Sequence, residues 1–328
     1  MISLKMNTYF NKIYRKKFRL LLLSATGFAV YFSVRSWNYS DNHESSCPKP
    51  SASPPTRIVS TSLASDELLV RILKKAGALD RLVAVSRFAE NPTYSHISTE
   101  VGNINARVGD NLEALASLRP DLVVFASFNR PAVTSTLKAI AAQTCWLDAF
   151  ESLHDIRSNI LKLGAAAGLS EAATQIAHQF ESDIQTEVRA TTAMTDAINP
   201  HSKPRVLSFD GSGTVMAGKT TFDDLVRLAG GINAASAASL AGWPRINDEA
   251  LAAMAPEIIV LLTDTHSAED LIAQLQSTPG WRETPAVKNS RFVTPSSADL
   301  LALSPDVLRV VPALRAKFYA PSNQERLP

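Results

Sequence analysis

The residues Gly213–Thr220 (GTVMAGKT) satisfy the pattern G-x4-G-K-[ST], in which backbone N–H groups and a lysine hold nucleotide phosphates. A strand is predicted before this run and a helix after it, and Asp264 follows a later apolar strand, as a magnesium ligand would. However, Val215 and Met216 are bulky where a phosphate cradle favours compact residues. The alternative is a loop in which these two residues form a short extra strand or pack underneath, with Lys219 on the rim. An exported or anchored P-loop NTPase therefore remains an alternative function.

Other catalytic or metal-binding patterns are weak. No G-x-S-x-G elbow occurs, and the two cysteines, Cys47 and Cys145, are too few for an iron–sulfur cluster, a four-thiolate zinc site or a disulfide framework. Cys145, in the apolar run TCWL, is predicted to be a small buried hydrophobe, and no lipobox precedes Cys47. We expect no enzymatic activity, no cofactor and no metal site, and we keep a metal-ion-binding transport protein as a second alternative. The histidines are scattered along the chain: His43, His96, His154, His178, His201 and His266.

Aromatic and arginine side chains gather at the predicted ends of strands. Aromatic faces suit a large, partly apolar ligand, and arginine suits its pendant carboxylates or amides. Their convergence around one cleft predicts a ligand-binding site rather than a catalytic one. The candidate ligand-binding residues are Arg87 and Phe88 after LVAVS, Arg107 in the loop before Asn111, Phe128 after DLVVFAS, Phe209 at the end of a strand, and Trp243 in the run Trp243-Pro244-Arg245.

The charge of the chain is concentrated at its beginning. The 328 residues carry a formal net charge of only +2, which argues against a nucleic-acid partner. Residues 1–40 hold seven basic and no acidic side chains, so 26 basic and 31 acidic residues remain in the rest. The basic run Arg15–Arg19 followed by the uncharged stretch Leu20–Val34 predicts that residues 1–35 are a signal peptide or an N-terminal membrane anchor. We therefore place the folded part outside the cytoplasmic membrane.

Beyond that segment, the sequence predicts two lobes. Residues 36–56 are rich in serine and proline and are predicted to be a flexible tether. After them, short β-branched runs alternate with helical stretches, which indicates an α/β fold with mainly parallel sheets. The predicted helices include 66–76, ending at Gly77, and 222–229, ending at Gly230-Gly231. The predicted strands are 57–60, 82–85, 122–125, 144–147, 206–209, 258–262 and 291–294.

An internal repeat indicates that one lobe duplicates the other. Asn111–Phe125 aligns without gaps with Asn247–Leu261, and seven of the fifteen pairs are identical. Each copy is predicted to be a short helix, a proline that ends it, an acidic residue and a buried strand. A second similarity, between Ser65–Leu73 and Phe222–Leu228, occurs in the same order.

Between the copies, Glu171–Ala197 contains no glycine or proline, which predicts a helix of roughly 40 Å that serves as a stiff strut. The predicted domains are an N-terminal α/β lobe (57–152), linker helices (153–200), a C-terminal α/β lobe (201–320) and a tail (321–328). The two Rossmann-like lobes would enclose a cleft at the carboxyl ends of their strands, where open parallel sheets bind ligands.

Five segments of the chain carry a resemblance to a known family: RIVSTSLASDELL, LVAVSRFAENP, VGNINARVGDNLEALASLRPDLVVF, TTFDDLVRLAGGINAA and GWPRINDEALAAMAPEIIVL. In these segments the sequence resembles the extracytoplasmic substrate-binding proteins of ABC importers for cobalamin, iron–siderophores and haem. The similarity covers about residues 57–318. It implies the class III periplasmic-binding-protein fold, with two α/β lobes joined by one long helix, and capture of a corrinoid, a ferric chelate or haem.

The resemblance also implies roles for individual residues. Glu113 and Glu249, at equivalent places in the repeat, would each dock into arginines of a membrane permease coupled to a cytoplasmic ATPase. Phe88 and Trp243 match aromatic positions of cobalamin-binding members, whereas Asn105-Ala106-Arg107 replaces a frequent aromatic. This departure leaves an anionic iron chelate or haem as an alternative to cobalamin. We expect a monomer, exported by its N-terminal segment and attached to the membrane if that segment is uncleaved.

Overall fold

In the computed structural model, the described residues are 47–49, 53–108, 112–127, 142–198, 203–263 and 266–320. The predicted signal or anchor segment, most of the tether, Phe128 and the tail lie outside them. Within the described part, no helix is long and apolar enough to cross a membrane.

The first lobe is built on a five-stranded sheet in which every neighbouring pair is parallel. Its strand order is β3-β2-β1-β4-β5. All five residues of β4 are buried, which explains why this strand is a continuous apolar run in the sequence. The strands are β1 (Ile58–Ser60), β2 (Leu82–Ser86), β3 (Ala106–Val108), β4 (Leu122–Ala126) and β5 (Gln143–Leu147).

The second lobe repeats this plan with four parallel strands in the order β7-β6-β8-β9. In both lobes the first strand lies between the next strand of the chain and a later one, so β6, β7, β8 and β9 correspond to β1, β2, β4 and β5. The predicted α/β fold with two parallel-sheet lobes is thus confirmed. The strands are β6 (Arg205–Phe209), β7 (Ile232–Asn233), β8 (Ile258–Leu261) and β9 (Phe292–Val293).

The predicted helix boundaries follow from local capping. Helix α3 (Leu63–Lys75) begins after Ser62, whose side chain accepts a hydrogen bond from Ser65 N, and Gly77 beyond its end has φ +65°. The corresponding helix α8 (Thr221–Leu228) is capped by Thr220 and followed by Gly230 at φ +90°. The remaining elements of the lobes are η2 (Leu79–Arg81), α4 (Leu112–Ser117), α9 (Ala234–Ala237), α10 (Asp248–Met254), α11 (Ala268–Ser277), α12 (Pro279–Arg282), α13 (Pro285–Lys288), α14 (Ser297–Leu301), η4 (Pro305–Arg309) and α15 (Val310–Phe318).

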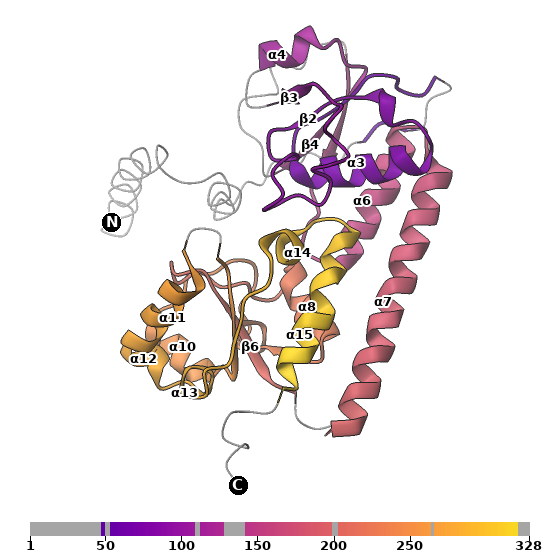
Figure 1. Ribbon diagram of the computed structural model, residues 1–328. Coiled ribbons are helices and arrows are strands. Elements are labelled where there is room, and N and C mark those ends of the chain that lie inside the picture. The colour runs from indigo at the N-terminus through magenta and orange to yellow at the C-terminus, as the bar shows by residue number, and fades with distance from the viewer. Residues whose placement is uncertain are drawn as a thin grey trace, which may run out of the picture. The chain divides into compact units, whose positions relative to one another are not determined.

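Two antiparallel helices connect the lobes (Figure 1). Helix α6 (Leu153–Ala166) leads into α7 (Ser170–Ile198), whose 29 residues span about 43 Å. The two helices approach closely at Gly164, where an added Cβ would lie 2.1 Å from the Cβ of Ala173. Helix α7 is the strut that the uninterrupted stretch Glu171–Ala197 predicts.

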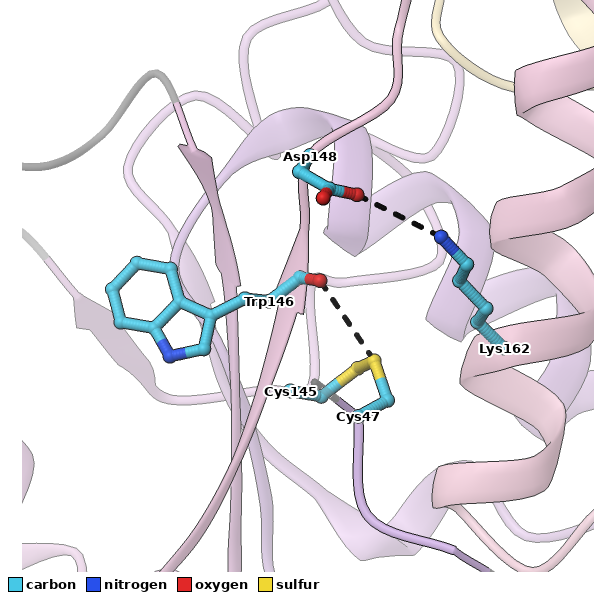
Figure 2. The surroundings of a disulfide bond; sticks show 5 residues. All are labelled: Cys47, Cys145, Trp146, Asp148 and Lys162. Atoms are coloured by element: carbon cyan, nitrogen blue, oxygen red, sulfur yellow. Dashed lines mark hydrogen bonds and ion pairs between the residues drawn. A yellow bond between two sulfur atoms is a disulfide. The ribbon is translucent and has the colours of Figure 1, made fainter. Parts of the chain in front are cut away.

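One sequence-based interpretation is wrong: Cys145 is buried, but it is not simply a small hydrophobe. It forms a disulfide bond with Cys47, 98 residues away (Figure 2). Figure 2 shows the bond beside α6, near the ion pair of Lys162 Nζ and Asp148 Oδ1 at 3.7 Å. A disulfide between residues this distant has no local sequence signal, which is why the pairing was missed.

The end of the predicted tether is also attached to the first lobe. Thr56 donates hydrogen bonds from its backbone N and hydroxyl to Asp121, at 2.7 and 2.9 Å. Arg81 Nε donates to the carbonyl of Pro55 at 2.6 Å, and its Nη2 donates to Ala167 before the strut. Cys47 and residues 54–56 are therefore fixed to the folded body.

Candidate ligand-binding site

The run that matches the phosphate-loop pattern is an extended segment paired with the chain around Trp243. Bridges join Thr214 to Arg245 and Gly218 to Ala241. The backbone N–H groups that would cradle a phosphate are donated within the protein instead: Val215 to Pro244 O, Met216 to Ser208 Oγ, Ala217 to Gly242 O and Gly218 to Leu240 O. The geometry therefore does not form a phosphate cradle.

The side chains of this run are not arranged to bind a nucleotide either. Val215, Met216 and Ala217 are at most 2% exposed, so they pack under the loop. The hydroxyl of Thr220 donates to Ala217 O and accepts from Asp223 N, so it caps α8 and is not directed at a metal ion. Lys219 is exposed. The alternative in which Val215-Met216 packs beneath a loop with Lys219 on its rim is the one that the structure supports.

The same pairing fixes the position of Trp243. Its neighbours Gly242 and Pro244 accept backbone hydrogen bonds from Ala217 and Val215, at 2.9 and 3.1 Å. The Trp243 ring is half-buried, so part of its surface faces solvent. A rigid support beneath a partly exposed indole suits a residue that stacks on a ligand.

In the first lobe, a buried carboxylate holds the turn that carries Arg87 and Phe88. Asp66 accepts hydrogen bonds from the backbone N and hydroxyl of Ser86, at 3.1 and 2.5 Å. Burial raises the pKa of Asp66 to about 6, against the opposing effect of hydrogen bonds from Ser60 and Ser86. The Arg87 guanidinium lies 5.0 Å from the centroid of the half-buried Phe88 ring, in cation–π contact.

Arg107 is bound within its own lobe. Its Nη2 lies 3.0 Å from Glu90 Oε2, and its guanidinium also donates to the carbonyls of Val101, Ile104 and Ala106. These contacts hold the chain after Phe88 against β3. Arg107 therefore positions this loop, and its guanidinium already has partners before any ligand binds.

Two further candidates differ from the expected arrangement. Phe209 is 2% exposed and packs edge-to-face on Trp281, with ring centroids 4.8 Å apart. We therefore leave it out of the proposed site, since a ring in the core cannot reach a ligand. Phe128 lies outside the described residues.

A cavity of about 550 Å³ lies where the end of the first lobe meets the second. It is lined by Glu151, Ser152 and Asp155 from the first lobe and the start of α6, and by residues around Lys219 and Asp224 from the second. Asp224 Oδ2 accepts a hydrogen bond from Leu153 N at 2.9 Å, so the start of α6 contacts the second lobe directly beside this cavity. Neither Phe88 nor Trp243 lines it. The sequence gives no signal for this cavity, because the acidic residues of α8 are also typical of an ordinary helix start.

The two glutamates with a predicted docking role lie on corresponding helices. Glu113 is in α4 and Glu249 is in α10, each before the equivalent strand β4 or β8. Glu249 is exposed. The pairing of these helices with equivalent strands is what the internal repeat predicts.

No group of three or more histidine, cysteine, aspartate or glutamate side chains could hold a metal ion within the described part of the chain. His96 is the histidine with a described ion-pair partner: its Nε2 lies 3.2 Å from Asp299 Oδ1. His43 and His201 lie outside the described residues.

Comparisons with known proteins define the class of protein to which this fold belongs. A family model described as periplasmic binding protein matches residues 58–298, which include both sheets and the connecting helices. The chain therefore belongs to the periplasmic binding protein family, a family of binding proteins.

Individual relatives are consistent with this assignment. The chain is 26% identical over 278 residues to an uncharacterised ABC transporter substrate-binding lipoprotein of Bacillus subtilis, covering 83% of this chain and 82% of the relative. It is 25% identical over 275 residues to a vitamin B12-binding protein of Vibrio vulnificus, covering 84% and 94%. A periplasmic haem-binding protein of Pseudomonas aeruginosa has the same fold, with a TM-score of 0.66 and 24% identity over 82% of this chain and 94% of that structure.

Proposed function

We propose that this protein is the substrate-binding component of an ABC importer, and that it captures a corrinoid, a ferric chelate or haem between its lobes without altering it chemically. The observation that carries this proposal is the placement of half-buried aromatic rings on loops beyond strand ends in both lobes. Phe88 follows β2, and Trp243 is paired to the loop that follows β6. Parallel sheets bind ligands at these strand ends.

The names of the relatives support this ligand class, because they include vitamin B12-binding and haem-binding proteins. The two lobes follow one plan, and a permease made of two related halves would meet such a protein through equivalent positions. We therefore propose that Glu113 and Glu249 dock into permease arginines. Like charges at like positions set the register of such a contact.

We further propose that the protein acts outside the cytoplasmic membrane as a monomer, with residues 1–35 as a signal peptide or anchor. A disulfide bond supports this location, because such bonds persist in oxidising compartments. An NTPase function is not favoured, since the backbone N–H groups of Val215–Gly218 already have partners within the protein.

Quenching of intrinsic fluorescence tests the ligand class directly. Purified protein is titrated with cyanocobalamin, haemin and a panel of ferric siderophores, with free tryptophan as the control for inner-filter losses. We expect one ligand class to give saturable quenching with a Kd of about 1 μM or lower, which corresponds to about −8 kcal/mol. Quenching no stronger than that of free tryptophan for every compound would contradict the proposal.

A further inference from the structure

A polar junction joins the first lobe to the chain after β9, on the side of α14, η4 and α15 (Figure 1). Arg71 of α3 forms an ion pair with Asp306 of η4. His96, in the loop after β2, lies 3.2 Å from Asp299 of α14. Because α15, which follows η4, packs on α8 and α7, these contacts tie the first lobe to the second lobe and to the strut.

Glu67 lies at the centre of this junction and is only 1% exposed. Its Oε1 accepts a hydrogen bond from the backbone N of His96 at 3.1 Å, and its carboxyl group shares the buried hydroxyl of Ser304 with Asp306, whose Oδ2 lies 3.3 Å from that hydroxyl. Glu67 therefore contacts both sides of the junction, through His96 in the first lobe and Ser304 beyond β9.

The two buried carboxyl groups of the junction have opposite tendencies to ionise. Burial and, to a smaller extent, the nearby Asp306 carboxylate raise the pKa of Glu67 to about 7, against the hydrogen bonds from His96 and Ser304. Burial also disfavours the Asp306 carboxylate, but Arg71, His96 and Arg309 outweigh this effect and lower the pKa of Asp306. Of these two carboxyl groups, Asp306 therefore carries a negative charge at mildly acidic pH, and ionisation of Glu67 adds a second.

The surroundings offer Glu67 little compensation for that second charge. Arg71 and Arg309 are both paired to Asp306, and Lys74 lies 3.5 Å from Glu100. An adjoining cavity of about 620 Å³ gives water access to the junction from outside. The charged and titratable groups that face the junction and this cavity from the packed elements are Arg71, Lys74, Lys75, His96, Glu100, Asp183, Asp299, Asp306 and Arg309.

We propose that Glu67 is a proton-sensitive latch between the lobes: its protonated form keeps the junction closed, and its ionisation loosens the contact between α3 and η4. The latch works near neutral pH, where the first lobe becomes less tightly bound to Ser304 and Asp306 as the pH rises. This inference concerns the unliganded protein, so it does not depend on which ligand the cleft accepts.

Hydrogen–deuterium exchange of the unliganded protein tests the latch. Peptides that cover residues 299–309, which do not contain Asp66, are compared at about pH 5.5 and about pH 8.5, after correction for the intrinsic exchange rate. If opening returns Glu67 to an ordinary pKa, linkage predicts that opening is favoured about 30-fold more at the higher pH. In the Glu67→Gln variant, which keeps the shape of the side chain but cannot ionise, we expect no such difference.

The matched control is Asp66→Asn. Asp66 is an equally buried carboxyl on the same helix, but its hydrogen bonds lie within the first lobe. This variant should therefore keep the difference in corrected exchange between the two pH values at the junction. Equal corrected exchange at both pH values would overturn the proposal, and this outcome can be judged from the wild-type protein alone. If the Glu67→Gln variant still exchanges faster at the higher pH after correction, that would overturn the proposal as well.

Discussion

Asp121 and Glu257 make the same contact in their respective lobes. Asp121 Oδ1 accepts a hydrogen bond from the backbone N of Arg57 at 2.9 Å, and Glu257 Oε2 accepts one from Arg205 N at 2.8 Å. Each arginine directly precedes or opens the first strand of its lobe. Residues that are aligned in the sequence repeat therefore occupy equivalent places in the two lobes and make equivalent hydrogen bonds.

The arginine side chains extend this equivalence. Arg57 donates from its guanidinium to the carbonyl of Leu118 at 2.8 Å, and Arg205 donates to Met254 O at 2.8 Å. Leu118 and Met254 are aligned in the repeat, and the residue after each, Arg119 or Ala255, has φ 44°. Duplication of one lobe explains these shared details better than chance similarity between helix–proline–strand units.

The Asp121 contact predicts a pH-dependent loss of stability. Asp121→Ala removes the acceptor for Thr56 and Arg57, so we expect the free energy of unfolding at neutral pH to fall by about 1–3 kcal/mol. Burial opposes ionisation of Asp121, but these N–H groups outweigh it and lower its pKa. The stabilisation by ionised Asp121 is fully present above the ordinary aspartate pKa of the unfolded chain. It is lost as the pH falls through the lowered pKa of Asp121 in the folded protein.

Urea unfolding of the wild-type protein and the Asp121→Ala variant measures this effect at about pH 7 and below about pH 3. Glu257→Ala is the comparison variant, and it should cost less because Glu257 accepts one described backbone hydrogen bond where Asp121 accepts two. An equal loss from Asp121→Ala at both pH values would contradict the assigned role of its ionised form.

The disulfide bond predicts sensitivity to reducing agents. Cross-linking residues 98 apart restricts the unfolded chain, so reduction should lower the free energy of unfolding by about 2–4 kcal/mol. Thermal unfolding with and without a phosphine reductant measures the change. A Cys47→Ser, Cys145→Ala double variant should unfold like the reduced protein and should not respond to the reductant. Identical unfolding of the oxidised and reduced wild-type protein would refute the structural role of the bond.

The arrangement of the phosphate-loop-like run predicts that its lysine is dispensable. Lys219 is exposed, and the backbone N–H groups of Val215, Met216, Ala217 and Gly218 have partners within the protein. Lys219→Ala should therefore leave ligand affinity unchanged within about a factor of two, a difference of about 0.4 kcal/mol. Tight ATP binding by the wild-type protein that disappears in Lys219→Ala would instead favour the NTPase alternative.

Reversing both docking charges should separate binding from transport. In a Glu113→Arg, Glu249→Arg variant we expect ligand affinity to be unchanged and uptake through the permease to be abolished. Each exposed pair contributes only about 0–1 kcal/mol, but reversal places like charges opposite each other. Uptake of labelled ligand by cells that carry the importer measures the effect. Glu171→Arg, at the exposed start of the strut, is the control and should transport normally; normal uptake by the double variant would reject the docking assignment.

Much of this architecture could be predicted from the sequence, because strong local signals coincide with the buried elements. The apolar runs in the sequence correctly predict strands β4 and β8, and glycines correctly predict the ends of helices α3 and α8. Two strands were missed because they are short: β3 has three residues and contains Arg107, and β7 has two. Their pairing depends on neighbouring strands that the local sequence does not specify.

The candidate site was less predictable than the fold, because it depends on long-range contacts. Arg107 follows a pattern typical of a ligand-binding arginine, yet Glu90 and three carbonyls engage its guanidinium. Phe209 ends a strand, but it points into the core against Trp281. Glu67 gives no signal in the sequence beyond that of an acidic residue near a helix start, and only its long-range contacts with His96 and Ser304 distinguish it.

The most direct measurement of the central claim is calorimetric titration of the ligand found by quenching, with wild-type protein and with Phe88→Ala, Trp243→Ala and Trp243→Phe variants. We expect one site per chain. Either alanine variant should lower the affinity by about 1–3 kcal/mol, and Trp243→Phe should recover part of that loss because an aromatic face is kept. Unchanged affinity in either alanine variant, or two independent sites, would contradict a single ligand held between the two lobes.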